Sequence, residues 1–403
     1  MKKLFSYLSM ALVLALGATA CSNADVDTPV DELATGTQTI SLKVAVPGAS
    51  TYAYAPDDVV SYEDKNPDLH DVIIYFTDSD DDDDDTNNTV WRTVTVSSAN
   101  MSEITAGASK LVRDIPLTAT TYYAIGNIES SGSGAAGPVT NEAGSTVTIT
   151  DGATTVATLK TLMFKIADQQ DPVNHLHLFA KGTFTPVVGS ITPVSIVLKP
   201  AVARMELSGI EHKVPTANFE LTDIFINNTF KMISIDPGKY PYDTNAIKYA
   251  FDATVWSTGY DPNFHIHFTG KTGAAAYTPT NKWGFSVVPA QKKDSQGTYV
   301  GNMMYTVIDG VTDSFQFGAV PIIVFKLLYS GNTKYLVVTN YKNTTGGDIV
   351  PYFEAGKVYI ISNVQFDASD LQDEPIPGGN SQTSVTATVS VQNWAPQNID
   401  PVF

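Results

Sequence analysis

The chain has 403 residues, of which 43% are hydrophobic, and it carries a formal net charge of -18. The hydrophobic fraction is enough for ordinary packed cores, so the composition excludes an intrinsically disordered chain. The length gives two domains as the expectation. The negative charge argues against nucleic acid as a partner, because its phosphates require Lys and Arg, and it also disfavours electrostatic attachment to anionic lipid.

The first 20 residues have the layout of a secretory signal peptide. Lys2 and Lys3 precede the apolar run LFSYLSMALVLALGATA, which is too short for a comfortable transmembrane helix. Cys21 follows at once and is the only cysteine, so it cannot form an internal disulfide. The residues before it resemble the lipobox of bacterial lipoproteins, in which the peptidase cuts before the cysteine and its sulfur carries lipid. We expect a lipoprotein signal peptide over 1–20 and lipidation at Cys21. An ordinary signal peptide beside a chance cysteine is the alternative.

Short alternating segments follow an acidic tether expected over 21–35. In the first, TISLKVAV, four apolar residues share one face of the strand: Ile40, Leu42, Val44 and Val46. Similar segments, rich in β-branched and aromatic residues and bounded by Gly, Asn, Asp or Pro, recur up to GKVYIISNVQF near the end. One helix is expected within NMSEITAGASKLVRDI. The pattern predicts an all-β chain of antiparallel β-sandwiches with few short helices, divided into an N-terminal domain (36–199) and a C-terminal domain (200–369).

Two stretches are expected to be exposed. Six consecutive aspartates, Asp80 to Asp85, favour a solvated hairpin loop, because the spacing of an EF-hand calcium loop is absent. A Pro- and Gly-rich stretch predicts a flexible connector over 370–382. It is followed by the segment 383–403, in which one further strand has its apolar residues on one face: Val385, Ala387, Val389 and Val391, with Trp394 after them.

The sequence lacks the common catalytic and phosphate-binding motifs, including G-x-S-x-G, H-E-x-x-H and C-x-x-C. We therefore expect no catalytic residues, no cofactor and no metal. Two H-x-H strings, His175 with His177 and His265 with His267, place paired imidazoles on one strand face and leave zinc or copper binding as an alternative. Three aromatic residues are candidates for sugar stacking, although a core or interface role is the simpler interpretation: Trp256, Tyr260 and Trp283.

Several segments, in chain order, resemble the fimbrillin family of Bacteroidetes, the FimA-type subunits of type V pili. They are the lipobox, TISLKVAV, TTYYAIGNI, LKPAVARMELSGIEHK, YFEAGKVYIISNVQF and the C-terminal VTATVSVQNWAPQNIDPVF. Each motif alone is weak, but together they cover essentially the whole chain. The resemblance implies sandwich domains of the transthyretin-like, Greek-key kind.

The resemblance also implies a mechanism of assembly. Such subunits cross to the outer membrane as lipoproteins, and a protease then removes the anchor and the first strand. The emptied groove accepts the C-terminal strand of another subunit, which is β-augmentation in trans. This assigns the first strand as the displaced one and 383–403 as the donor. The implied partners are other copies of the chain, accessory fimbrial subunits, outer-membrane lipid through Cys21, and host or bacterial surface receptors.

One feature departs from the family. Its members commonly carry an Arg after the first strand, where an Arg-specific protease cuts, whereas residues 44–64 contain no Lys or Arg. Without cleavage the protein would remain lipid-anchored as a base or accessory subunit. A surface carbohydrate-binding lipoprotein is the second alternative.

N-terminal sequencing of the surface-assembled form distinguishes these fates. A mature N-terminus between Pro47 and Lys65 is expected for a polymerising subunit that has lost its first strand. A mature N-terminus at Cys21 would instead indicate a retained anchor.

Overall fold

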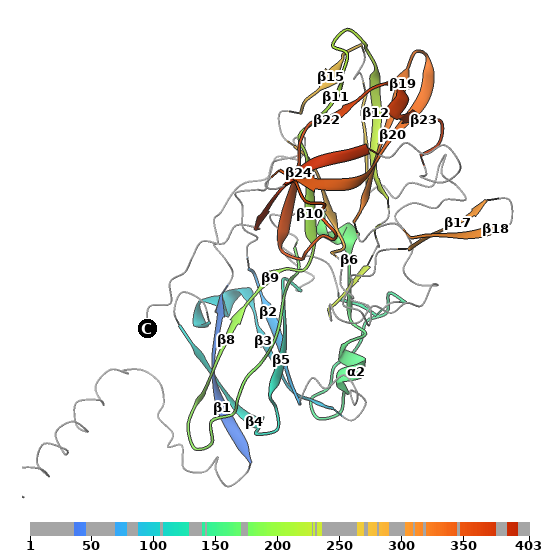
Figure 1. Ribbon diagram of the computed structural model, residues 1–403. Helices are drawn as coiled ribbons and strands as arrows, with labels where there is room; N and C mark the ends of the chain where they lie inside the picture. The colour runs from blue at the N-terminus through green and yellow to red at the C-terminus, as the bar shows by residue number, and fades with distance from the viewer. Residues whose placement is uncertain are drawn as a thin grey trace, which may run out of the picture.

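The computed structural model describes residues 36–45, 69–78, 88–104, 108–128, 139–141, 143–170, 176–227, 229, 232–235, 264–269, 273–279, 282–289, 303–308, 311–316, 320–344, 347–375 and 385–393. Within these ranges nearly all regular structure is β-strand (Figure 1). The helical elements are the short α-helix α2 (Val156–Leu159) and the 3-10 helices η2 (Ser98–Glu103), η3 (Ile166–Gln169) and η6 (Ala368–Asp370). The prediction of an all-β chain with few short helices is confirmed. None of the described helices is long and apolar enough to cross a lipid bilayer.

Two sheets face each other in the N-terminal half. One has the order β3 (Val90–Val96), β2 (Val72–Thr77), β5 (Thr121–Gly126), β7 (Leu178–Thr183) and β9 (Lys199–Pro200). The other has the order β4 (Lys110–Pro116), β1 (Thr37–Ala45) and β8 (Thr192–Val197). A compact apolar core separates them, to which Ile74, Phe76 and Leu178 contribute from the first sheet and Leu42 and Ile196 from the second. The helix expected within residues 100–115 is present only as the end of η2, and β4 follows it.

The C-terminal half is built around one large sheet. Its order is β14 (His265–His267), β12 (Glu220–Asn227), β19 (Ile322–Tyr329), β20 (Asn332–Asn343), β24 (Val385–Asn393), β21 (Lys357–Ile361), β10 (Ala203–Leu207) and β16 (Trp283–Val287), with β23 (Leu371–Gln372) beside β20. Smaller groups are β15 (Ala276–Tyr277), β11 (Ile210–His212) and β22 (Val364–Phe366); β13 (Met232–Ser234) with β6 (Met163–Lys165); and the hairpin β17 (Met303–Ile308) with β18 (Val311–Gln316).

The sheets are mixed rather than purely antiparallel. Among the described pairs, four are parallel: β1 with β8, β10 with β21, β11 with β22, and β20 with β24. Parallel neighbours cannot be joined by a tight hairpin. Each of these pairs therefore joins segments that are distant in the chain, and their pairing could not be read from local turn signals.

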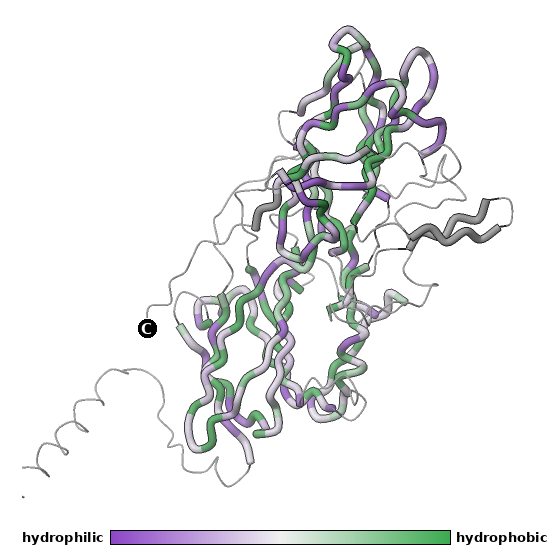
Figure 2. Tube along the Cα trace, in the orientation of Figure 1, coloured by the Kyte–Doolittle hydropathy of each residue, from purple (hydrophilic) through white to green (hydrophobic). Residues whose placement is uncertain are grey.

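The two halves share a continuous core. The outer face of the β2–β5–β7 sheet contributes Tyr123 and Phe179, and the same cluster continues into Phe285 and Phe325 of the C-terminal sheet. Since both faces of β5 are covered, all six of its residues are buried. Hydrophobic positions accordingly follow the strands through both halves (Figure 2). Strand pairing between β6 and β13 also connects the two halves. The domain boundaries stay predictions.

A buried ion pair lies where the chain enters the C-terminal sheet. The side chains of Arg204 and Glu206 on β10 are almost inaccessible, with 3.4 Å between Arg204 Nε and Glu206 Oε1. The guanidinium lies across Gly284 of β16, where an added Cβ would be 2.1 Å from Arg204 Nη2. A glycine therefore leaves space for Arg204 against the neighbouring strand.

Replacement of Glu206 by Leu should lower the free energy of unfolding by about 3–5 kcal/mol, because it removes the buried carboxylate that pairs with Arg204. The double variant Arg204→Met/Glu206→Leu should recover most of this loss, since apolar replacements of buried pairs are often neutral. Urea unfolding measures both. A single variant as stable as the parent would show that the pair contributes nothing.

Candidate functional site: the terminal strands

The first strand lies in the middle of its sheet. β1 pairs antiparallel with β4 on one edge and parallel with β8 on the other (Figure 1). Ile40, Leu42 and Val44 point into the core, with exposed fractions of 0%, 0% and 3%, whereas Lys43 is exposed. Val46 lies outside the described residues. Removal of β1 would therefore open a slot with two unpaired backbone edges and an apolar floor.

A buried glutamine fixes the position of β1 in this slot. Gln38 Nε2 donates to the carbonyl oxygens of Pro116 and Ala119 at 3.1 and 3.4 Å, and Gln38 Oε1 accepts from Thr192 Oγ1 at 2.7 Å. One side chain thus contacts both flanking regions, at the end of β4 and the start of β8. Sequence reasoning missed this residue, because a single Gln in an alternating strand carries no signal of such a role.

The last strand is also an interior strand, in the sheet of its own chain. β24 pairs parallel with β20 and antiparallel with β21. Ala387 and Val389 are buried, while Thr386 and Thr388 are exposed. For Val385 and Val391 only the backbone is described, in register with Val338 and Tyr359 respectively. Trp394 and Cys21 lie outside the described residues.

The slots of β1 and β24 have the same design. Each strand has nine residues, and each has one parallel and one antiparallel neighbour. Each also alternates apolar inward residues with outward polar ones. In backbone polarity and apolar pattern, a strand suited to one slot is therefore suited to the other.

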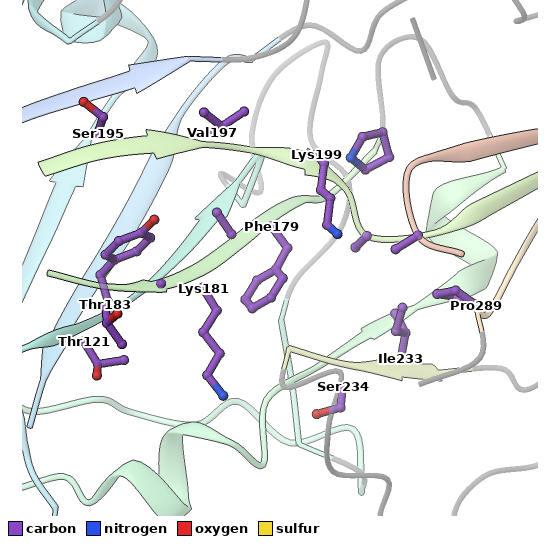
Figure 3. A pocket seen from close by; sticks show the side chains of 16 residues that line it. Thr121, Phe179, Lys181, Thr183, Ser195, Val197, Lys199, Ile233, Ser234 and Pro289 are labelled. Carbon is purple, nitrogen blue, oxygen red and sulfur yellow. The ribbon is translucent and has the colours of Figure 1, made fainter. Parts of the chain in front are cut away.

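A pocket of about 610 Å³ lies beside β8 (Figure 3). Phe179 and Lys181 of β7 line it together with Val197 and Lys199, and Ile233 contributes from the C-terminal half. Among the described residues that line it there is no Asp, Glu, His or Cys. The pocket offers an apolar surface flanked by lysines next to β8.

Of the other candidate residues from the sequence analysis, the second H-x-H string aside, two are buried and the rest lie outside the described residues. His177 is buried and its ring stacks on Phe164, with centroids 4.3 Å apart, so it serves packing. Trp283 is buried and packs edge-on against Phe268, which excludes it from sugar stacking on the surface. The other candidates lie outside the described residues: His175, Asp80 to Asp85, Trp256 and Tyr260.

The second H-x-H string does form a cluster with a carboxylate. His265 and His267 project from β14 toward Asp223 of β12, and each ring has a nitrogen 2.8 Å from Asp223 Oδ1. The H-x-H spacing predicted the two imidazoles on one face. Nothing in the sequence indicated Asp223, which lies more than 40 residues earlier in the chain.

Comparison with known proteins gives no family assignment. No model of a known protein family matches the sequence, and no curated protein matches it either.

Solved structures similar to this chain include a fimbrilin and proteins described as putative cell adhesion proteins. One is a putative cell adhesion protein of Parabacteroides distasonis, with 13% identity and a TM-score of 0.48, over 90% of this chain and 98% of that one. Another is a fimbrilin of Porphyromonas gingivalis, with 12% identity and a TM-score of 0.48, over 90% of this chain and 98% of that one. A third is the tip fimbrial protein Mfa3 of Porphyromonas gingivalis with a C-terminal truncation, with 12% identity and a TM-score of 0.41, over 89% of this chain and 99% of that one. Because the identities and the TM-scores are low, these structures carry no argument about the function of this protein.

Replacing Gln38 by Ala should lower the free energy of unfolding by about 1–3 kcal/mol, because Thr192 then loses its buried acceptor and two carbonyls lose their donor. Chemical denaturation of the full chain measures this. Lys43→Ala, an exposed substitution in the same strand, is the matched control and should change stability by less than about 0.5 kcal/mol. Equal effects of the two variants would show that Gln38 does not fix β1.

Proposed function

We propose that this protein is a structural subunit of a surface filament. In this proposal it is exported as a lipoprotein through Cys21 and polymerises by exchange of its terminal strands. The polymer supports adhesion, and the protein has no enzymatic activity. The observation that carries the proposal is the match between β1 and β24 in length, neighbour polarity and apolar alternation.

The free energy of an open slot supports exchange. Loss of β1 leaves the contacts of Ile40, Leu42 and Val44 unmade, at about 1.5–3 kcal/mol for each side chain. It also leaves ladder hydrogen bonds unmade on both edges, each worth about 1 kcal/mol. An open slot therefore costs on the order of 10 kcal/mol. A subunit with such a slot has a strong tendency to bind a strand of the right pattern.

Side-chain size makes the exchange depend on removal of β1. The described inward residues of β24 are Ala387 and Val389, whereas β1 supplies Ile40 and Leu42. Each missing methylene costs about 0.8 kcal/mol, so β24 fills the slot less well than β1. An intact β1 would therefore outcompete the donor, and polymerisation requires that β1 be cut off. Since residues 44–64 contain no Lys or Arg, this step requires a protease of another specificity.

Release of β24 from its own sheet is the opposing term. It exposes Ala387 and Val389 and leaves the facing edges of β20 and β21 unpaired. The donor strand gains the same kind of pairing in the next subunit, so the number of paired strands is conserved at each junction. Because the contact is head-to-tail, it generates an open filament rather than a closed ring.

Truncation after Gln382 tests the proposal, because it removes the donor strand and leaves the slot of β1 in place. Both proteins are first cleaved after β1. The one that keeps residues 383–403 should form filaments visible by electron microscopy, and the one that lacks them should stay monomeric. Val389→Asp should also abolish filaments, since it places a charge on the inward face. Thr388→Ala, its exposed neighbour, is the matched control and should polymerise normally. Filaments formed by the truncated protein would contradict the proposal.

A further inference from the structure

A polar cluster lies at one edge of the C-terminal sheet, far along the chain from either terminal strand. β14 is the outermost strand of that sheet in the described part of the chain, and it pairs antiparallel with β12. His267 is opposite Asp223 and His265 is opposite Phe225. Residues two apart on a strand share a face, so both imidazoles lie on the face of Asp223, while Ile266 packs toward the core.

A β-bulge places Asp223 on this face. The pairing of β12 with β19 shifts register between Leu221 and Asp223. Leu221 belongs to the apolar core and so does Ile224, which means that the inward phase changes from odd to even positions at the bulge. Without the bulge, Asp223 would share the core face with Leu221. Bulges commonly redirect a side chain in this way next to functional sites.

The three side chains converge closely. His265 Nε2 and His267 Nδ1 each lie 2.8 Å from Asp223 Oδ1, and the three ligand atoms lie within 4.8 Å of one another. The side chain of Asp223 is 6% exposed and that of His267 is 61% exposed, so the cluster is anchored inside and open to solvent. Lys326 Nζ lies 3.4 Å from the other carboxylate oxygen.

The carboxylate is held in its charged form. Burial alone would raise the pKa of Asp223, but hydrogen bonds from His267, His265 and Thr222, together with the charge of Lys326, lower this pKa to about 2. An ionised carboxylate can bind a metal ion directly, whereas each imidazole must be neutral, with its proton on the ring nitrogen that faces away from Asp223.

We propose that Asp223, His265 and His267 bind a divalent first-row transition-metal ion, a property independent of filament assembly. Two imidazole nitrogens and one carboxylate favour Zn²⁺, Ni²⁺ or Cu²⁺ over Mg²⁺ and Ca²⁺, which prefer oxygen ligands. Metal–ligand bonds of about 2.1 Å separate neighbouring ligand atoms by about 3.0 Å at right angles and by about 3.4 Å at the tetrahedral angle of Zn²⁺, so each 2.8 Å contact must open by about 0.2–0.6 Å. Water or a group of a second molecule would complete the coordination.

Metal binding would stabilise the pairing of the edge strand β14 with β12. β14 is only three residues long, and its link to β12 would gain a metal bridge in place of two hydrogen bonds. A ligand that binds only the folded state stabilises it in proportion to the logarithm of its concentration. Metal should therefore raise the melting temperature of the protein. Lys326 competes with the ion for Asp223, so its removal should strengthen binding.

Calorimetric titration of Zn²⁺ into the full chain tests the site, with Cys21→Ser as the background so that no thiol contributes. One Zn²⁺ per chain is expected, with a matching rise in melting temperature that EDTA reverses. Asp223→Asn and His267→Asn keep polar side chains of similar reach. Each should weaken binding by more than about 100-fold, because even outer-shell changes cost about 10- to 100-fold.

Two lysine variants form the matched pair. Lys326→Met should raise Zn²⁺ affinity several-fold. Lys213→Met removes a lysine that pairs with Asp367 and Asp370 elsewhere, and it should leave the affinity unchanged. Absence of stoichiometric Zn²⁺ binding would overturn the proposal. Binding that survives Asp223→Asn would also overturn it, because the two histidines alone would then account for the metal.

Discussion

An interior β-strand must satisfy two backbone edges and one apolar face at once. In this protein the interior strand of the three-stranded sheet in the N-terminal half is β1, which lies far along the chain from both of its neighbours. Loss of an edge strand would expose one row of backbone groups, whereas loss of β1 would split its sheet in two. The integrity of the N-terminal half therefore depends on a nine-residue segment that a single cut in the chain could release.

The sheet that lies opposite β1 is supported by contacts on its other side. Within the opposite sheet, β5 is buried on both faces, since it lies between the core under β1 and the core shared with the C-terminal half. Pairing of β6 with β13 connects the halves by backbone hydrogen bonds. In the proposed exchange, a sandwich that has lost β1 would rely on these contacts to keep its other strands in place.

Alternation in the sequence was enough to predict the all-β class and the inward positions of those residues of β1 and β24 whose side chains are described, because burial follows a period of two along a strand. Alternation could not predict which strands pair with each other. Parallel pairing joins distant segments, so the position of β24 between β20 and β21 of its own chain was missed. Local pattern also missed Gln38, whose role depends on two distant turns, and Asp223, whose direction depends on a bulge that breaks the alternation.

The most direct test is a cryo-electron microscopy map of the assembled filament, in which the path of each terminal strand can be traced. The proposed exchange places β24 of one subunit between β4 and β8 of the next, in the slot that β1 has left, parallel to β8. A map in which β1 still fills that slot and β24 still lies between β20 and β21 of its own subunit would contradict it.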